Sequence, residues 1–215
     1  MVDPQWHKRW QEDRIGFHKA AVHEDLDEFA DSFLTGAKRI LIPLCGKSLD
    51  LDYLAGRGHE VIGVELVEKA VVQVFEDAGR VPEVRELGPI KVYRHDSLTV
   101  YCGDVFDVGP EVVGPIDRIW DRAALVALDS SVRPKYVKHL RSLAEPGARL
   151  LQNVMEYDQS VMDGPPWSIS EAEIRQHYGD LTIDVLRQQD VIDEVRWKER
   201  GHQWWKSCAY LVHLT

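Results

Sequence analysis

From Arg39 onward the sequence alternates short apolar runs with helical segments, and this alternation constrains the fold more than any other feature. The apolar runs have the length of buried strands and lie at residues 40–43, 61–64, 116–120 and 148–154. The segments with helical periodicity lie at residues 49–55, 67–78 and 132–143. Strand and helix in alternation predict an α/β fold with a largely parallel sheet covered by helices on both faces.

The last third of the chain departs from this alternation. Two long strand-like segments occupy residues 181–191 and 203–214, and residues 197–201 between them are predicted to form a turn. This pattern predicts an antiparallel strand pair at one edge of the sheet. Ser170 with Glu173 three residues later has the spacing of a capping box, so a helix is expected to begin there.

The N-terminal segment is predicted to be helical. Asp3 and Pro4 have the order of an N-cap followed by proline in the first turn. Trp6 and Trp10 are four residues apart, which puts both indoles on one face of that helix. A second helix is expected over residues 24–32. Residues 145–147, Glu-Pro-Gly, are expected to stop the helix that precedes them.

Length and charge limit the classes of function. With 215 residues, the chain is expected to form a single domain, residues 1–215. Its net charge of -10 repels phosphate backbones and anionic lipid, which argues against nucleic acid and membrane partners. No apolar run is long enough to span a bilayer and residues 1–14 lack the apolar core of a signal peptide, so a cytoplasmic location is expected. The three cysteines are too far apart in sequence to suggest a metal cluster or a disulfide framework.

Residues 41–48, LIPLCGKS, follow the first predicted strand and admit three interpretations. A phosphate-binding P-loop needs a glycine five positions before Gly46, where this chain has Leu41. A dinucleotide site needs a glycine-rich turn against the pyrophosphate, and only one glycine is present here. S-adenosylmethionine contains no phosphate, and a turn with one glycine can pass beneath its amino-acid tail.

The third interpretation predicts a carboxylate that accepts hydrogen bonds from the ribose hydroxyls at the end of the next strand. Glu65 stands there, 19 residues after Gly46. Asp104 follows a further strand, where its loop would meet the adenine. A solvated strand-end charge at Glu65 and a simple turn aspartate at position 104 remain the alternatives.

Several separated motifs together resemble the thiopurine S-methyltransferases, in order and spacing, over nearly the whole chain. They are Trp6-x-x-x-Trp10 with Gly16-Phe17-His18, Pro43-Leu44-Cys45-Gly46-Lys47, Arg57-Gly58-His59-Glu60-Val61-Ile62-Gly63-Val64-Glu65, Phe106-Asp107, Ile119-Trp120-Asp121-Arg122-Ala123-Ala124-Leu125-Val126-Ala127, and Gly164-Pro165-Pro166. The chain is similar to the compact, bacterial-type members of this family.

The resemblance implies the Rossmann-like fold of class I S-adenosylmethionine-dependent methyltransferases. That fold has a mostly parallel seven-stranded sheet with an antiparallel C-terminal edge, here expected in residues 37–215. Residues 1–36 would form a helical lid over the active site of a monomer. The resemblance further implies two sets of site residues. The cofactor side comprises Trp6, Trp10, Leu44, Gly46, Glu65, Asp104, Val105 and Arg122, and the acceptor side comprises Phe17, His18, Arg122, Pro166, Trp167 and Arg196.

The expected acceptor is the sulfur of a small aromatic or heterocyclic thiol, and by analogy with bacterial relatives selenium or tellurium compounds. Aromatic rings of Trp6, Trp10 and Phe17 would stabilise the sulfonium through their faces. An aromatic thiol ionises near neutral pH, so no obligatory base and no metal are expected, and an arginine beside it would favour the thiolate. Asp121, which directly precedes Arg122, would on a purely structural interpretation be the N-cap of the helix-like run that follows. Three other functions remain: an N- or O-methyltransferase, a non-catalytic S-adenosylmethionine-binding protein, and an ATPase using residues 46–48.

Overall fold

The structure is a computed structural model that describes residues 4–194 and 197–214. Contacts between Cα atoms divide the chain into two compact units, Met1–Ile119 (unit 1) and Trp120–Thr215 (unit 2). The division falls inside strand β6 (Ile116–Arg122), so the chain passes from one unit to the next within an extended segment. The two units are described separately below.

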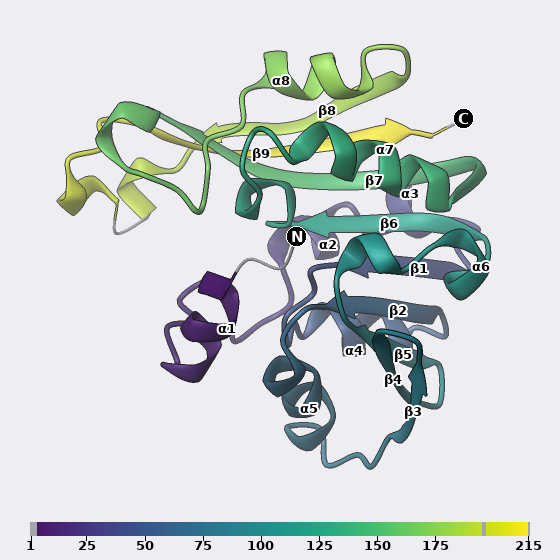
Figure 1. The fold of residues 1–215 in the computed structure, drawn as a ribbon. Helices are drawn as coiled ribbons and strands as arrows, with labels where there is room; N and C mark the ends of the chain where they lie inside the picture. The colour runs from purple at the N-terminus through teal and green to yellow at the C-terminus, as the bar shows by residue number, and fades with distance from the viewer. Residues whose placement is uncertain (1–3, 195–196, 215) are drawn as a thin grey trace. The chain divides into compact units, whose positions relative to one another are not determined.

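Unit 1 contains a mixed sheet. Its strands are β1 (Arg39–Pro43), β2 (Glu60–Glu65), β3 (Glu83–Leu87), β4 (Ile90–His95), β5 (Leu98–Cys102) and β6. They follow the order β3-β4-β5-β2-β1-β6 (Figure 1). The ladders between β5, β2, β1 and β6 are parallel, and β3-β4 and β4-β5 are antiparallel. The strands predicted at residues 40–43, 61–64 and 116–120 are therefore confirmed, while β3 and β4 were not predicted.

The centre of this sheet has the burial expected of parallel strands. Ile40, Leu41 and Ile42 of β1 are all buried although their side chains alternate between the two faces. Gly63 of β2 is so tightly enclosed that a Cβ there would lie 2.9 Å from Sγ of Cys45. Because β1, β2 and β5 are parallel, their carboxyl ends meet at one edge, and the loops that carry predicted site residues follow from that edge.

The helices of unit 1 are α1 (Pro4–Gln11), α2 (Glu24–Glu28), α3 (Ala30–Leu34), α4 (Asp50–Gly56), α5 (Glu68–Glu76) and α6 (Pro110–Val113). The helix predicted over residues 24–32 is wrong as one element. At Phe29 the backbone leaves the α region (φ -98°, ψ 11°), which separates α2 from α3. Pro4 opens α1 as predicted, and the predicted N-cap Asp3 lies outside the described residues.

Unit 2 contains an antiparallel sheet in the order β7-β9-β8 (Figure 1). Its elements are β7 (Ala144–Tyr157), β8 (Thr182–Asp190), β9 (Trp205–His213), α7 (Arg133–Leu143), α8 (Glu171–Tyr178) and the 3-10 helix η2 (Leu125–Ala127). β8 and β9 run antiparallel, which confirms the predicted C-terminal pair. None of the helices in residues 4–194 and 197–214 has the length and apolar character that a bilayer crossing requires.

Two details of unit 2 differ from expectation or refine it. Residues 145–147 are not a separate turn but belong to β7, which begins directly after α7, because α7 already ends at Leu143 and the chain extends from Ala144. The Ser170 hydroxyl does cap α8, accepting a hydrogen bond from the Glu173 amide over 3.2 Å. The Glu173 carboxylate, however, accepts from Arg133 over 2.7 Å instead of completing a capping box.

Candidate active site

Glu65 is the last residue of β2, and its carboxylate is held by the backbone. Its Oε2 accepts the amide N–H of Gly46 over 2.8 Å, and its Oε1 accepts that of Val67 over 2.8 Å. The side chain is buried, and this burial raises the pKa of Glu65 above its ordinary value, while the N–H donors of Val67, Gly46 and Leu66 act in the opposite direction. The Glu65 carboxylate therefore bonds the end of β2 to the loop after β1, and it is not a solvated strand-end charge.

The loop after β1 has two residues in the left-handed region. Leu44 has φ 48° and Gly46 has φ 54°. That conformation is open to glycine but costs a residue with a side chain about 1–2 kcal/mol, so Leu44 is held there by its surroundings. A Cβ on Gly46 would lie 3.5 Å from Cζ2 of Trp10, which shows that the indole packs directly over this glycine.

Three aromatic residues of the N-terminal segment pack together beside Gly46. The rings of Trp6 and Phe17 meet edge to face with centroids 5.7 Å apart, and those of Trp10 and Phe17 do so at 5.9 Å. Trp10 is 2% exposed and lies in one apolar cluster with Val67 and Ala70. The tryptophans four residues apart therefore face the same cluster, as predicted.

Lys69 of α5 attaches α1 to the rest of unit 1. Its Nζ donates to the carbonyl oxygen of Trp10 over 2.9 Å and to Oδ1 of Asp13 over 2.7 Å. Lys69 was not predicted as a site residue, because a lysine near the start of a helix gives no sign of a partner 56–59 positions earlier. Lys69 fixes the end of α1 in the position that puts Trp10 against Gly46.

Asp104 and Val105 lie at the same sheet edge as Glu65. Cys102, the last residue of β5, pairs with Glu65 in the parallel ladder, and the Gly103 amide donates to the Glu65 carbonyl over 2.9 Å. Asp104 follows at once, and its Oδ1 accepts the Phe106 amide over 3.1 Å, while Val105 is buried. The turn-aspartate alternative is thus correct about the local bond, and the residue also lies at the edge required by a cofactor role.

Lys47 does not have the environment of a phosphate-binding lysine. Its Nζ pairs with Oδ2 of Asp77 on the far end of α5, 2.9 Å away. The ion pair and the absence of a glycine at position 41 both argue against a P-loop.

The thiols near Glu65 are protonated at neutral pH. Burial raises the pKa of Cys45 well above its ordinary value and that of Cys102 to about 11. All three cysteines of the chain are unpaired and buried. Among the described residues, no three His, Cys, Asp or Glu side chains are grouped as a metal ion would require.

In unit 2, Arg122 is the last residue of β6 and is partly buried. Ala123 after it has φ 59°, a left-handed conformation that an alanine rarely adopts, so the chain turns sharply at this point. The 3-10 helix η2 follows within two residues.

Asp121, directly before Arg122, is completely buried at the base of this turn. Its Oδ1 accepts the amides of Ala124 and Leu125 over 3.2 Å each. Asp121 is nevertheless not the predicted helix N-cap, because it lies within β6 and the N-cap of η2 is Ala124. Its Oδ2 accepts the Tyr136 hydroxyl over 2.8 Å, and Gln152 Nε2 donates to the Asp121 carbonyl over 3.4 Å. Burial raises the pKa of Asp121 to about 6. Sequence reasoning missed Tyr136 and Gln152, which come from α7 and β7.

The loop that contains Pro166 and Trp167 is tied to the same part of unit 2. The Trp167 amide donates to the Val126 carbonyl in η2 over 2.7 Å, and the Tyr157 hydroxyl donates to the Pro166 carbonyl over 2.5 Å. The Trp167 ring lies on Gly164, where a Cβ would be 2.3 Å from its Cδ2. The predicted flap is thus a defined loop that packs on itself.

The structure brings the predicted residues together within each unit. Trp6, Trp10, Phe17, Gly46 and Glu65 form one contiguous group in unit 1. His18 follows Phe17, is partly buried, and donates its amide to Ile15. In unit 2, Arg122 and Trp167 are connected through the turn that contains Val126. Arg196 lies outside the described residues.

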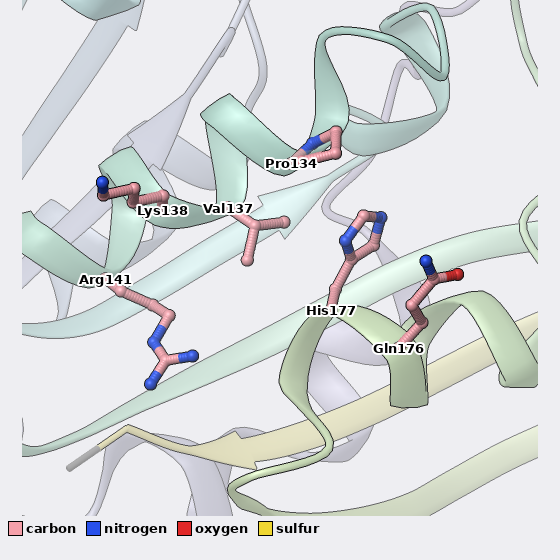
Figure 2. Close-up of a pocket in the computed structure, with 6 residues that line it drawn as sticks. All are labelled: Pro134, Val137, Lys138, Arg141, Gln176 and His177. Atoms are coloured by element: carbon pink, nitrogen blue, oxygen red, sulfur yellow. The ribbon is translucent and has the colours of Figure 1, made fainter.

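A groove of about 340 Å³ between α7 and α8 contains none of the predicted site residues. Figure 2 shows its lining residues, Pro134, Val137, Lys138, Arg141, Gln176 and His177. Arg141 is already paired with both carboxylate oxygens of Asp180, at 3.0 and 2.7 Å. Arg141 is thus engaged by a carboxylate of its own unit, and the groove lies apart from the predicted site residues.

Comparison with known proteins identifies close sequence relatives. The family model described as thiopurine S-methyltransferase matches residues 1–214. A protein of that name from Pseudomonas fluorescens (strain Pf0-1) is 44% identical over 195 residues, which cover 90% of this chain and 89% of the relative. Another from Azotobacter vinelandii is 42% identical over 205 residues, 94% of each chain.

Among solved structures, 1,6-didemethyltoxoflavin-N1-methyltransferase of Burkholderia thailandensis, with bound 1,6-didemethyltoxoflavin and S-adenosylhomocysteine, is similar with a TM-score of 0.63. It is 16% identical, and the match covers 99% of this chain and 86% of that one. At this identity the likeness shows the fold alone. The chain has the Rossmann-like α/β fold of class I S-adenosylmethionine-dependent methyltransferases, as predicted. The expected mostly parallel seven strands are wrong in detail, because the described residues form nine strands with both parallel and antiparallel ladders.

Proposed function

Because the chain belongs to the thiopurine S-methyltransferase family, we propose that it transfers the methyl group of S-adenosylmethionine to the sulfur of small aromatic or heterocyclic thiols such as thiopurines. The observation that carries this proposal is the buried Glu65 carboxylate bonded to the Gly46 amide at the end of β2. It places a fixed acceptor beside a one-glycine turn, which is what a ribose and an amino-acid tail without phosphate require.

The residues of unit 1 fit S-adenosylmethionine. A carboxylate offers about four lone-pair positions, and the Gly46 and Val67 amides use one on each oxygen of Glu65. The Leu66 N–H also acts on this carboxylate, so at least one position remains for a ribose hydroxyl. The turn at Leu44 and Gly46 would hold the amino-acid tail, and Asp104 with Val105 would hold the adenine.

When bound, S-adenosylmethionine supplies a methyl group on a sulfonium, and the acceptor sulfur gains the S–CH₃ bond as S-adenosylhomocysteine leaves. The faces of Trp6, Trp10 and Phe17 would stabilise that positive charge by about 0.5–2 kcal/mol per contact. Holding donor and acceptor in line contributes more, since effective molarities for well-oriented pairs reach roughly 10⁵ M. Most of the rate therefore comes from positioning.

The acceptor is a thiolate, which forms when an aromatic thiol releases its proton to water near neutral pH. Arg122 beside the acceptor would favour this anion, with Phe17, His18, Pro166, Trp167 and Arg196 shaping the pocket. No residue is assigned as an obligatory base. The buried thiols Cys45 and Cys102 stay protonated and so do not compete for the methyl group.

The proposal also covers further methyl acceptors, the oligomeric state, the domain arrangement and the location of the protein. We infer that selenium and tellurium compounds are accepted as well, because their anions are softer and form at lower pH than thiolates. The chain acts as a monomeric single domain in the cytoplasm, with residues 1–36 as a lid over the sheet core and without a metal. The contact of Trp10 with Gly46 and the Lys69 attachment support the lid.

The test is to incubate the purified protein with methyl-labelled S-adenosylmethionine and a thiopurine, and to look for the labelled thioether. Glu65→Ala removes the proposed ribose contact and is expected to lower kcat/KM at least tenfold, since a hydrogen bond to a charged group contributes about 1.5–3 kcal/mol. Glu68→Ala is the matched control, because Glu68 is a partly exposed carboxylate of the same unit that is bonded to Lys91 and to the Tyr93 hydroxyl. Cofactor binding without labelled product from the wild-type protein would contradict the proposal.

A further inference from the structure

Asp121 is the one completely buried carboxylate in unit 2 among the described residues, and the proposed reaction does not use it. Burying a carboxylate is unfavourable unless its oxygens are well bonded. Here Oδ1 accepts two amides, from Ala124 and Leu125, and Oδ2 accepts the Tyr136 hydroxyl. Three hydrogen-bond donors thus stabilise a buried carboxylate at this position, although a neutral side chain would be less unfavourable to bury.

The bonds of Asp121 enclose Arg122 and Ala123. The carboxylate holds the amides of residues 124 and 125, so the two residues between must form a tight turn, and Ala123 takes φ 59° within it. This conformation costs about 1–2 kcal/mol for a residue with a Cβ. Asp121 therefore maintains the turn that determines the direction of Arg122.

The same turn is hydrogen-bonded to the loop that contains Pro166 and Trp167. Val126 lies one residue beyond Leu125, and its carbonyl accepts the Trp167 amide over 2.7 Å. The Asp121 carboxylate and the loop that carries Pro166 and Trp167 are thus both hydrogen-bonded to η2, at adjacent residues of the backbone. Tyr136 and Gln152 hold Asp121 itself from α7 and β7.

We propose that Asp121 is a positioning residue that orients Arg122 and the Pro166–Trp167 loop for the methyl acceptor. The expected effect of Asp121 on kcat/KM rests on the proposed function. The orientation of Arg122 by Asp121 does not depend on which molecule is methylated.

The first experiment is a double-mutant cycle on kcat/KM for a thiopurine with Asp121→Asn and Arg122→Lys. Asparagine keeps the size of the side chain, and Asp184→Asn at the surface hydrogen bond with His213 is the matched control. Asp121→Asn is expected to lower kcat/KM about tenfold in the wild-type background but less than threefold with Arg122→Lys. Because Arg122 is also expected on the cofactor side, the dissociation constant of S-adenosylmethionine should rise in Asp121→Asn and stay unchanged in Asp184→Asn. Losses that multiply independently would overturn the proposal.

The second experiment measures Arg122 directly and needs no substrate. The NMR order parameter of the Arg122 Nε–H should fall in Asp121→Asn and stay unchanged in Asp184→Asn. An unchanged order parameter in Asp121→Asn would overturn the orientation of Arg122 by Asp121. Failure of the wild-type protein to methylate any thiol would instead contradict the proposed function, and the order parameter would still decide this inference.

A pH profile gives a readout that a purely structural role would not produce. The ratio of wild-type to Asp121→Asn activity cancels the ionisation of the acceptor. It should fall as pH decreases through about 6, where Asp121 becomes protonated and holds its amides less firmly. The groups that face Asp121 are Tyr136, Gln152 and Tyr178, and burial keeps both phenols neutral there. Tyr136→Phe removes one donor and should move this decrease to higher pH.

Discussion

The amide of Gly46 donates to Oε2 of Glu65 over 2.8 Å, so the turn after β1 and the end of β2 are one bonded unit. Since Oε1 of the same carboxylate holds the Val67 amide, the start of α5 belongs to it as well. A substitution at Glu65 should therefore change both the proposed ribose contact and the conformation of the turn after β1.

Glu65→Gln should weaken S-adenosylmethionine binding while leaving the protein folded. The amide has one accepting oxygen, so either the Gly46 or the Val67 N–H meets an NH₂ group in place of an acceptor. We expect a loss of about tenfold to a hundredfold in affinity, measured by calorimetry. Glu68→Gln should bind normally, and equal affinities for both variants would contradict the role of Glu65.

Lys69→Met should loosen α1. The substitution keeps the aliphatic length but removes the bonds to the Trp10 carbonyl and to Asp13. Such partly exposed bonds contribute on the order of 1 kcal/mol, so hydrogen exchange in residues 4–18 should speed up by up to tenfold. Lys91→Met, which breaks the ion pair with Glu68, is the control and should leave this segment unchanged. Exchange equally slow in both variants would show that α1 is held by its aromatic contacts alone.

Asp121→Asn should become more stable relative to the wild type as pH rises. The folded-state pKa of Asp121 is about 6 against an ordinary 3.8, so the stability that this shift provides is complete below pH 3.8 and lost as pH rises through 6. The difference in free energy of unfolding between pH 4 and pH 7 should be on the order of 3 kcal/mol. Urea unfolding of both proteins across this range measures it, and parallel curves would contradict the raised pKa.

Gly63→Ala should destabilise unit 1 by overpacking. The new Cβ would lie 2.9 Å from Cys45 Sγ and 3.3 Å from Cδ2 of Leu51, in the centre of the sheet. Such overpacking costs typically about 1–3 kcal/mol. Adding Cys45→Ala removes the nearest atom, so the double variant should lose less free energy of unfolding than the two single losses combined. A simple sum would show that the sulfur does not cause the conflict.

The sequence predicted the elements whose burial is uniform. β1 and β2 consist of apolar runs bounded by polar residues, and their positions follow from that pattern. β3 was not predictable in this way, since every one of its five residues is exposed and its charged residues follow no alternation. It forms because β4 offers an unpaired edge, which is information from the tertiary structure.

The residues of the candidate site likewise fall into those that the sequence pattern predicted and those that only the tertiary structure reveals. Glu65 and Gly46 could be found from their spacing, because a strand and the loop before the next helix have standard lengths. The Asp121 bonds to Tyr136 and Gln152 could not, since they join residues 15 and 31 positions apart whose side chains meet only in the folded core. Sequence identified what local periodicity controls and missed what distant side chains contribute.

The contact between Gly164 and Trp167 makes their evolution interdependent. The indole fills the space where any side chain at position 164 would begin, so variation at that position is blocked while tryptophan is present. A lineage that descends from this sequence must first acquire a smaller residue at position 167, and only then can position 164 diversify. The order of substitutions in this loop is therefore constrained, because position 167 must change before position 164 can.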